Sequence, residues 1–375
     1  MSTKAKLIVD SSENNSDLYY ISNFFVPDPV VFIEHDLEKI LVLNDLELDR
    51  GKKESVVDTI FSLKDYINKL PKRKLKKANL IDIVELIFKE RKIKSVIVQK
   101  TFPIAYADQL RKIGIKVIVS KDSFLYESRL VKRDYEIVNI KRALRKTAEA
   151  MNKAISLVAS STVKGKYLYY ENKILTSEHI KQTINSYLAF HGYLASHTIA
   201  AGGVQGSMPH HTGEGPILAG WPIVIDIFPR SQDSGYYGDM TRTIVKGEPS
   251  KELIKMYNTV LKGQILGISL IKDGVRSKEV HEAILNLFEE NGFKTGLIDG
   301  KPQGFIHSTG HGLGLDIHEP PRIGNSDEVL KEGNVVTVEP GLYYDNLGGI
   351  RIEDVVVVTK SGNVNLTKCR KRFKV

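Results

Sequence analysis

The sequence predicts a chain of two domains, a small α/β domain followed by a larger α+β domain. Its 375 residues exceed the size of one typical domain. The first third alternates short apolar runs with helical patterns, whereas the rest combines amphipathic helices with β-rich segments. Because the pattern changes at about residues 123–133, we expect domains at residues 1–128 and 129–375.

In the first domain, short apolar runs indicate four strands: Val30–Ile33, Ile40–Leu43, Ile93–Val98 and Ile115–Val119. The last two flank a helical pattern over residues 105–113 that ends at Gly114. No glycine-rich phosphate loop follows any of these runs, so the sequence gives no support for nucleotide binding here.

The second domain begins with a long helical pattern. Apolar residues recur at three- and four-residue steps from Ile137 to Ile155, which predicts an amphipathic helix with Asp134 as its N-cap. Three further helices are expected: about Ser177 to His191, one from Ser250, and one from Ser277 that stops at Gly292. β-rich segments between and after them predict helices packed around an antiparallel sheet.

The charge balance does not by itself indicate a nucleic-acid partner. The formal net charge is +9, but the lysines are spread along the chain and only residues 71–77 and 368–374 form basic clusters. We interpret both clusters as solvated surface. The single cysteine, Cys369, rules out an internal disulfide, and residues 1–15 lack an apolar signal core. We therefore expect a cytoplasmic protein, and no stretch reaches the roughly 20 apolar residues of a membrane-spanning helix.

Five potential metal ligands lie in runs of glycines and β-formers. They are Asp226 in VIDIFP, Asp239 in GYYGDMTRT, His311 in STGHGLGL, Glu339 in VTVEPGLY and Glu353 in GIRIEDVVVV. Four carboxylates close together would repel one another and lose hydration, so some would protonate unless cations balanced them. The pattern therefore predicts a site for divalent cations.

Two predicted strand pairs can bring these ligands together. Residues 224–227 and 239–245 read as strands joined by the turn Arg230–Gly235, and residues 335–339 and 349–358 read as a second pair. Neighbouring strands lie about 4.8 Å apart, compatible with ions roughly 3.5–4 Å apart. Oxygen ligands with one imidazole favour manganese, cobalt or iron, and zinc is possible in a catalytic site. We expect manganese or cobalt.

The motifs SMPHH, HSTGHGLGLDIHEPP, TVEPGLYY and GGIRIED resemble those of the pita-bread metallopeptidases, the family of prolidase, aminopeptidase P and methionine aminopeptidase. The resemblance is strong over residues 130–375 and implies a pita-bread (creatinase/aminopeptidase) catalytic domain, with residues 1–128 as the accessory domain of the prolidase branch. One departure is the 13-residue separation of Asp226 and Asp239, two more than is common in the family. An even-numbered insertion preserves the face that each strand presents, so ligand pairing should survive.

The resemblance also implies roles for single residues. Asp226 would bind one cation, Asp239 and Glu353 would bridge two, and His311 with Glu339 would complete the second site. Glu339 would also shuttle a proton, and His210 and His318 would donate hydrogen bonds in the transition state. Two residues keep two readings each: His307 contacts substrate or packs behind the ligands, and Arg351 orients a ligand carboxylate, which we favour, or supports the substrate.

These features predict a dinuclear metal-dependent exopeptidase that cleaves the bond before proline, either a prolidase or an aminopeptidase P. Family analogy implies a homodimer. Two alternatives are a creatine-type amidinohydrolase relative, and a non-catalytic peptide- or nucleic-acid-binding protein on the same fold. Both predict loss of ligands, and all five ligand types are present.

Overall fold

The computed structural model describes residues 4–75 and 78–375. The chain divides into two compact units, Met1–Arg129 and Leu130–Val375, which places the division one residue after the expected boundary. Part of the basic cluster at residues 71–77 lies outside the described residues.

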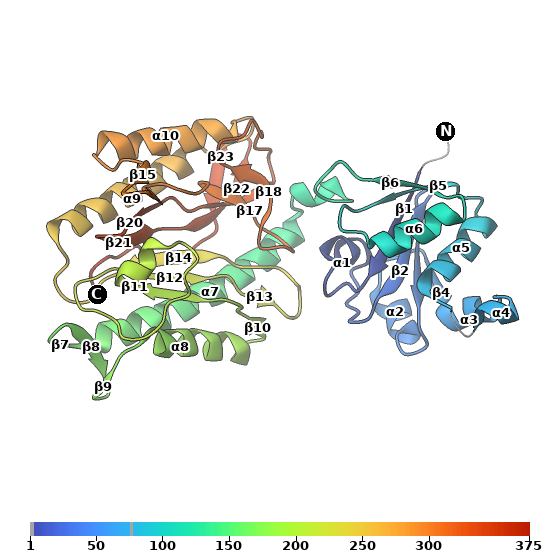
Figure 1. Ribbon diagram of the computed structural model, residues 1–375, viewed down its shortest axis with the longest axis horizontal. Coiled ribbons are helices and arrows are strands. Elements are labelled where there is room, and N and C mark those ends of the chain that lie inside the picture. The colour runs from blue at the N-terminus through green and yellow to red at the C-terminus, as the bar shows by residue number, and fades with distance from the viewer. Residues whose placement is uncertain (1–3, 76–77) are drawn as a thin grey trace. The chain divides into compact units, whose positions relative to one another are not determined.

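The first unit is a mixed six-stranded sheet with helices on both faces (Figure 1). The strand order is β4-β3-β2-β1-β5-β6, with antiparallel pairing among β1, β2 and β3 and parallel pairing elsewhere. The strands are β1 (Ala5–Asp10), β2 (Val30–His35), β3 (Glu38–Leu43), β4 (Thr59–Ser62), β5 (Ser95–Val98) and β6 (Lys116–Val119). The helices are α1 (Ser16–Ser22), α2 (Leu48–Glu54), α3 (Leu63–Asn68), α4 (Lys72–Leu75), α5 (Leu80–Glu90) and α6 (Ile104–Lys112), followed by the 3-10 turn Glu127–Leu130.

Alternation along the strands creates the two cores of this unit. Leu7 and Val9 belong to one apolar cluster, whereas Ile8 between them belongs to a second cluster on the opposite face. The four strands expected from sequence correspond to β2, β3, β5 and β6, and the expected helix corresponds to α6. Short strands β1 and β4 were not anticipated.

In the second unit, strands lie between two pairs of long helices (Figure 1). Helices α7 (Asp134–Ser160) and α8 (Ser177–Phe190) cover one side, and α9 (Lys251–Leu270) and α10 (Ser277–Glu290) cover the other. The main sheets are antiparallel: β11 (Ile199–Gly202), β12 (Ile223–Ile227) and β14 (Met240–Ile244) in one, and β18 (Glu319–Ile323), β17 (Gly310–Gly312), β19 (Val335–Val338), β22 (Asp354–Thr359) and β23 (Gly362–Asn365) in the other.

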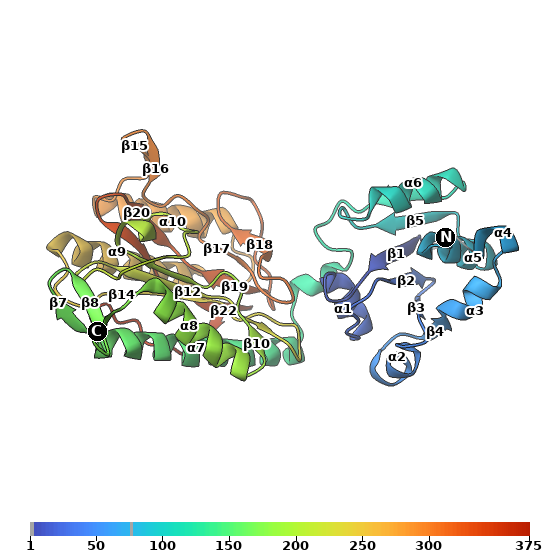
Figure 2. The same ribbon diagram turned by 60° about the horizontal axis from the view of Figure 1, so that its bottom comes forward.

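Smaller strand groups complete this unit. They are the pair β20 (Gly341–Tyr344) and β21 (Gly348–Arg351), the pair β10 (Tyr193–Leu194) and β13 (Arg230–Ser231), the pair β15 (Gly296–Ile298) and β16 (Lys301–Gln303), and the triplet β7 (Thr162–Lys164), β8 (Tyr167–Tyr170) and β9 (Lys173–Ile174). Figure 2 shows β15 and β16 projecting from the body of the unit. The turn expected at Arg230–Gly235 thus contains a short strand that pairs with β10.

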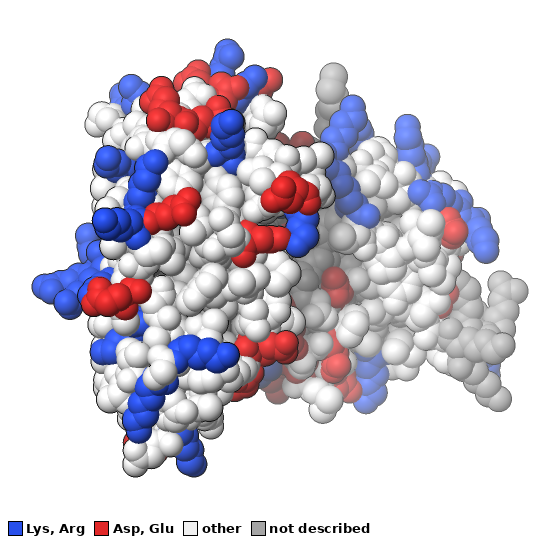
Figure 3. All heavy atoms as spheres, turned by 60° about the vertical axis from the view of Figure 1, so that its left-hand side comes forward, with Lys and Arg blue, Asp and Glu red and all other residues white. Residues whose placement is uncertain are grey.

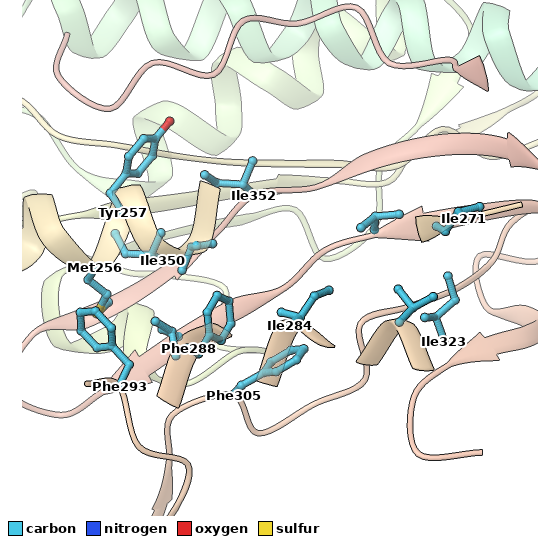
Figure 4. Packing of buried hydrophobic residues seen from close by; sticks show 14 of the residues in the cluster. Met256, Tyr257, Ile271, Ile284, Phe288, Phe293, Phe305, Ile323, Ile350 and Ile352 are labelled. Carbon is cyan, nitrogen blue, oxygen red and sulfur yellow. The ribbon is translucent and has the colours of Figure 1, made fainter. Parts of the chain in front are cut away.

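Both helix layers bury apolar side chains against the strands. Figure 4 shows Ile284 and Phe288 of α10 packed near Ile350 and Ile352, with Phe305 beside them. Fully burying such a side chain stabilises the fold by about 1.5–3 kcal/mol. Because apolar layers enclose the strands on both sides, the ligand-bearing strand ends are held on a rigid frame.

The start of α7 corrects one expectation. Asp134 is the first helical residue, and the N-cap is Arg133, whose extended backbone has φ −74° and ψ 160°. The Glu136 carboxylate accepts the Arg133 backbone N–H at 3.2 Å, which satisfies a donor at the helix start.

The predicted second strand pair is also wrong in detail. The segment expected as one strand over residues 349–358 is split into β21 and β22 at Ile352 and Glu353. The Glu353 backbone N–H donates to the carbonyl of Thr241 at 3.1 Å, so the chain leaves its pairing with β20 before it joins β19. Likewise, Asp226 lies across from Thr241, and Asp239 directly precedes β14.

Charged side chains are mixed on the face drawn in Figure 3, where lysines and arginines lie among acidic residues. Among the described residues, no helix is both long enough and apolar enough to cross a membrane.

Candidate metal centre

The structure gathers every site residue expected from sequence around one pocket of the second unit. The pocket has a volume of about 710 Å³. Its walls include the five expected ligands and four other expected residues: Asp226, Asp239, His311, Glu339, Glu353, His210, His307, His318 and Arg351. The ligands come from five different strands or the residues next to them, since β12, β14, β17, β19 and β22 all contain or adjoin one of them.

Three of the ligands form a compact cluster. Asp239, His311 and Glu353 are buried, and each offers a ligand atom within 4.8 Å of the others. The His311 Nε2 atom lies 3.6 Å from Oδ2 of Asp239 and 3.3 Å from Oε1 of Glu339. Three carboxylates and one imidazole, from four separate segments, therefore converge.

Burial makes this cluster electrostatically costly without a cation. Desolvation, followed by the nearby Glu353 carboxylate, raises the pKa of Asp239 well above its ordinary value. Desolvation and then Glu339 do the same to the pKa of Glu353. Burial, partly opposed by Arg351, raises the pKa of Glu339 to about 8. A divalent cation would reverse these shifts by stabilising the ionised carboxylates.

His311 is prepared as a neutral ligand. Burial, with a smaller contribution from His318, lowers its pKa to about 3. Its Nδ1 lies 3.0 Å from the Gly312 carbonyl, which can only accept a hydrogen bond. The proton therefore resides on Nδ1, and the unprotonated Nε2 faces the carboxylates.

Arg351 fixes two of the ligand carboxylates through an orienting network, which we define as Arg351, Thr241, Tyr343 and His307. Its Nη2 donates to Oδ2 of Asp226 at 2.7 Å. Its Nε donates to Oγ1 of Thr241 at 3.2 Å, and that hydroxyl donates to Oε2 of Glu353 at 2.8 Å. One oxygen of each carboxylate is thereby held in place.

The other oxygens of the same two carboxylates are free to bind a cation. Oδ1 of Asp226 and Oε1 of Glu353 are buried and have no hydrogen-bond partner among the described residues. Buried polar atoms are normally paired, so two orphaned carboxylate oxygens beside a neutral imidazole fit a metal site. Hard oxygen donors with one nitrogen suit manganese, cobalt or iron.

His307 and Tyr343 complete the orienting network. The His307 Nδ1 lies 2.7 Å from the Ser308 carbonyl, so its proton is on Nδ1 and its Nε2 accepts from the Tyr343 hydroxyl at 2.9 Å. That hydroxyl accepts in turn from Nη1 of Arg351 at 2.7 Å. Burial, followed by the Arg351 charge, lowers the pKa of His307 to about 3, which keeps the imidazole neutral.

Comparison with known proteins agrees with this centre. The model of the Peptidase_M24 family, metallopeptidase family M24, matches residues 138–360. The chain belongs to metallopeptidase family M24.

Relatives match this M24 chain over its whole length. It is 29% identical to a Xaa-Pro dipeptidase of Pyrococcus horikoshii over 100% of this chain and 99% of that protein. It is 30% identical to a Xaa-Pro dipeptidase of Pyrococcus furiosus over 98% of each. A solved structure, a Xaa-Pro dipeptidase from Bacillus anthracis, matches with a TM-score of 0.83 and 26% identity over 99% of this chain and 95% of that one. The pita-bread fold and the branch of prolidase and aminopeptidase P, both predicted from sequence, are confirmed.

Three other histidines, His318, His210 and His211, differ in how they lie relative to the pocket. His318 stands with its ring 4.5 Å from that of His311, at an interplanar angle of 87°. His210 lines the pocket, whereas Nδ1 of His211 accepts the backbone N–H of Gly213 at 3.0 Å and turns into its own loop. The structure thus places these two adjacent histidines differently, with only His210 lining the pocket.

Three of the pocket residues that sequence reasoning missed have side chains able to contact a substrate. His197, Phe228 and Arg322 all contribute to the walls of the pocket. Phe228 and Arg322 follow ligand or histidine motifs closely, in DIFPR and HEPPR, which was a usable signal. His197 has a left-handed backbone with φ 58°, and no sequence pattern indicates it.

Proposed function

We propose that this chain is a dinuclear metal-dependent exopeptidase that hydrolyses the peptide bond before proline. The observation that carries the proposal is the pair of orphaned carboxylate oxygens, on Asp226 and Glu353, in the pocket where Asp239, His311 and Glu353 form a compact buried cluster. The names of the full-length relatives support the Xaa-Pro substrate class. A non-catalytic binding protein is not favoured, because it would have no use for a maintained ligand cluster.

The ligands divide between two cations in the proposed site. Asp226 would hold one, Asp239 and Glu353 would be shared, and His311 with Glu339 would hold the other. Such cations supply a nucleophilic water at neutral pH and polarise the scissile carbonyl. Manganese or cobalt suits this donor set, and zinc or iron is the alternative.

The side chains around the cluster would perform the remaining steps. Glu339 would accept the proton of the attacking water and pass it to the leaving nitrogen of proline. His210 and His318 line the pocket and would donate hydrogen bonds to the charge that develops on the carbonyl oxygen. The orienting network would keep the ligand carboxylates fixed during turnover.

Arg322 favours a dipeptidase over an aminopeptidase that acts on long peptides. Of the two arginines that line the pocket, Arg351 is committed to Asp226 and Tyr343. Arg322 is exposed to the pocket, and its guanidinium has no ion-pair partner in the part of the chain that the structure describes. It could therefore bind the free carboxylate that follows proline in a dipeptide.

Replacing Arg322 tests this substrate class. Arg322→Met should raise KM for Ala-Pro about 10- to 100-fold, since a hydrogen bond to a charged group contributes about 1.5–3 kcal/mol. Ala-Pro-amide lacks the carboxylate and serves as the matched substrate, whose KM should not change. Equal losses for both substrates would contradict carboxylate recognition by Arg322.

The overall proposal is tested with protein stripped of metal by a chelator. Hydrolysis of Gly-Pro, Ala-Pro and Ala-Pro-Pro is compared after addition of manganese, cobalt, zinc or no metal, with Gly-Ala as the control without proline. We expect dipeptides with proline to be cleaved only after metal is added. We also propose that the protein is cytoplasmic and forms a homodimer. Sedimentation analysis tests the homodimer. Metal-loaded protein that cleaves no Xaa-Pro bond would refute the function.

A further inference from the structure

A buried ion pair links the first residues of the catalytic unit to the segment that carries His318. Nζ of Lys132 lies 2.7 Å from Oε2 of Glu319, and each side chain is only 1% exposed. Taking two charges out of water costs free energy that their attraction does not reliably restore, so such a pair is weak evidence for stability. Its contacts indicate a positional role instead.

Glu319 organises the loop of residues 313–318 around its carboxylate. Oε1 accepts the backbone N–H of Asp316 at 3.0 Å, while Oε2 faces Lys132. Gly314 packs directly on this carboxylate, since a Cβ there would lie 2.7 Å from Oε2 and 2.9 Å from Oε1. The loop therefore wraps around a single charged group.

His318 is the last residue of that loop and is covalently next to Glu319. The His318 and His311 rings make a T-shaped contact with 4.5 Å between their centroids, and His318 also lines the pocket. Because Glu319 begins β18, a shift of its carboxylate moves the backbone that carries the His318 imidazole. The ion pair is thus one residue away from a group proposed to touch the substrate.

The other end of the pair is anchored in the same unit. The backbone N–H of Lys132 donates to the Gly333 carbonyl at 2.8 Å, and Nδ2 of Asn334 donates to the Leu130 carbonyl at 2.8 Å. Residues 333 and 334 lead directly into β19 and so to Glu339. Lys132 therefore connects the loop that carries His318 to β19, the strand that leads to Glu339, the proposed proton shuttle.

We propose that Lys132 is a positioning residue for His318, acting through its buried ion pair with Glu319. Without the ammonium group, Oε2 of the buried Glu319 carboxylate loses the partner that lies 2.7 Å away, and the carboxylate shifts from its place in the loop. This shift releases the loop of residues 313–318. The inference rests on the proposed function for the role of His318, but its structural part can be measured separately.

The test compares Lys132→Met with variants that restore the cation beside Glu319 or remove the charge of Glu319. Lys132→Met should lower kcat for Ala-Pro about 10- to 100-fold, because a misplacement of about 1 Å can cost that much. KM and bound metal should change less than threefold. Lys132→Arg should recover most of the turnover because it restores a cation beside Oε2 of Glu319, and Lys132→Met/Glu319→Gln should do so because the ionised carboxylate that needs that cation is gone.

Two further readouts decide whether the effect passes through His318. In Lys132→Met/His318→Ala, kcat should equal that of His318→Ala alone. The imidazole NMR signal of His318, identified as the one lost in His318→Ala, should shift in Lys132→Met. The control is Lys146→Met, which breaks an ion pair of 2.7 Å with Glu149 elsewhere in the same unit; it should leave the His318 signal unmoved.

Several outcomes would overturn the proposal. In the first, the losses in kcat multiply when Lys132→Met is combined with His318→Ala. In the second, the NMR signal of His318 does not shift in Lys132→Met. In the third, kcat does not recover in Lys132→Met/Glu319→Gln. If Lys132→Met does not fold, Glu319→Gln and Lys132→Arg provide the same comparisons. If the wild-type protein cleaves no Xaa-Pro peptide, the proposed function fails, and the NMR signal still decides the positional role.

Discussion

At the scale of single residues, the site depends on which oxygen of each carboxylate already accepts a hydrogen bond. Asp226 and Glu353 each give one oxygen to the orienting network and keep the other unpaired. A hydrogen bond to one carboxylate oxygen restricts rotation of the group, so the second oxygen points in a defined direction. The network therefore supports the metal centre without contributing a ligand of its own.

Loss of Asp239, which we propose as a ligand shared by two cations, should be the most severe single change. Asp239→Ala should abolish hydrolysis and reduce bound metal, with a larger effect than the roughly 10- to 100-fold that loss of an outer partner costs. Metal analysis and kcat/KM on the purified variant measure this. Asp233→Ala, an exposed acid in the turn between β12 and β14, is the control. Normal metal content in Asp239→Ala would remove Asp239 from the ligand set.

Two adjacent tyrosines offer a matched test of the orienting network. Tyr343→Phe removes the hydroxyl between His307 and Arg351 and should lower kcat about 10-fold, because Arg351 loses a partner that aligns it on Asp226. Tyr344 faces the other side of β20, where its hydroxyl donates to the Lys294 carbonyl. Tyr344→Phe should leave kcat unchanged, and equal losses in both variants would indicate a general packing effect.

At the scale of elements, β17 brings His311 close to its neighbours only because glycines flank it. A Cβ on Gly310 would lie 2.0 Å from the Thr337 carbonyl oxygen, and one on Gly312 would lie 2.3 Å from the Pro320 carbonyl oxygen. Real side chains do not tolerate such contacts, so the strands would separate. The glycines around His311 thus permit a close approach of neighbouring backbones.

An alanine at Gly310 should disturb this strand and the centre together. We expect Gly310→Ala to lower the free energy of unfolding by about 2–4 kcal/mol and to weaken metal binding, because β17 must move away from β19. Chemical denaturation and metal titration measure both effects. Gly362, in β23 of the same sheet, has nothing within 4 Å of an added Cβ, so Gly362→Ala should be close to neutral. Unchanged metal affinity in Gly310→Ala would contradict this account.

At the scale of the whole molecule, metal and pH should be linked in stability. In metal-free protein, the pKa of Glu339 is raised from 4.5 to about 8, so the folded state holds its proton more tightly than the unfolded state. That contribution to stability is complete below pH 4.5 and is lost as pH rises toward 8. The lowered pKa values of His307 and His311 act in the opposite direction, but only below about pH 6.5.

Between pH 6.5 and 8 the metal-free protein should therefore become less stable. The loss is at most about 1.4 kcal/mol per pH unit for one proton. Manganese should reduce this loss, because the ionised carboxylates then bind the cation. Thermal unfolding at several pH values, with chelator or with manganese, measures the difference. Glu339→Gln should make the metal-free profile less steep, while the raised pKa values of Asp239 and Glu353 leave part of the slope. An unchanged slope in that variant would contradict the assignment to Glu339.

The sequence by itself determined the chemistry of the protein and much of its architecture. The ligand types, their order and the helical periodicities are local features, so Asp226, Asp239, His311, Glu339 and Glu353 could be read directly as one candidate set. The tertiary structure decided what depends on contacts between distant segments. The break between β21 and β22 arises because Glu353 bonds to Thr241, more than 100 residues away.

The same reason explains what the sequence left open at the site. Whether Arg351 meets a ligand or the substrate, whether His210 or His211 faces the pocket, and where Arg322 lies all depend on strand register and loop packing. These are set by the sum of many non-local contacts, which no short motif records. Residue type determined which reactions the protein could support, and only the folded chain determined which oxygen, nitrogen or guanidinium faces the centre.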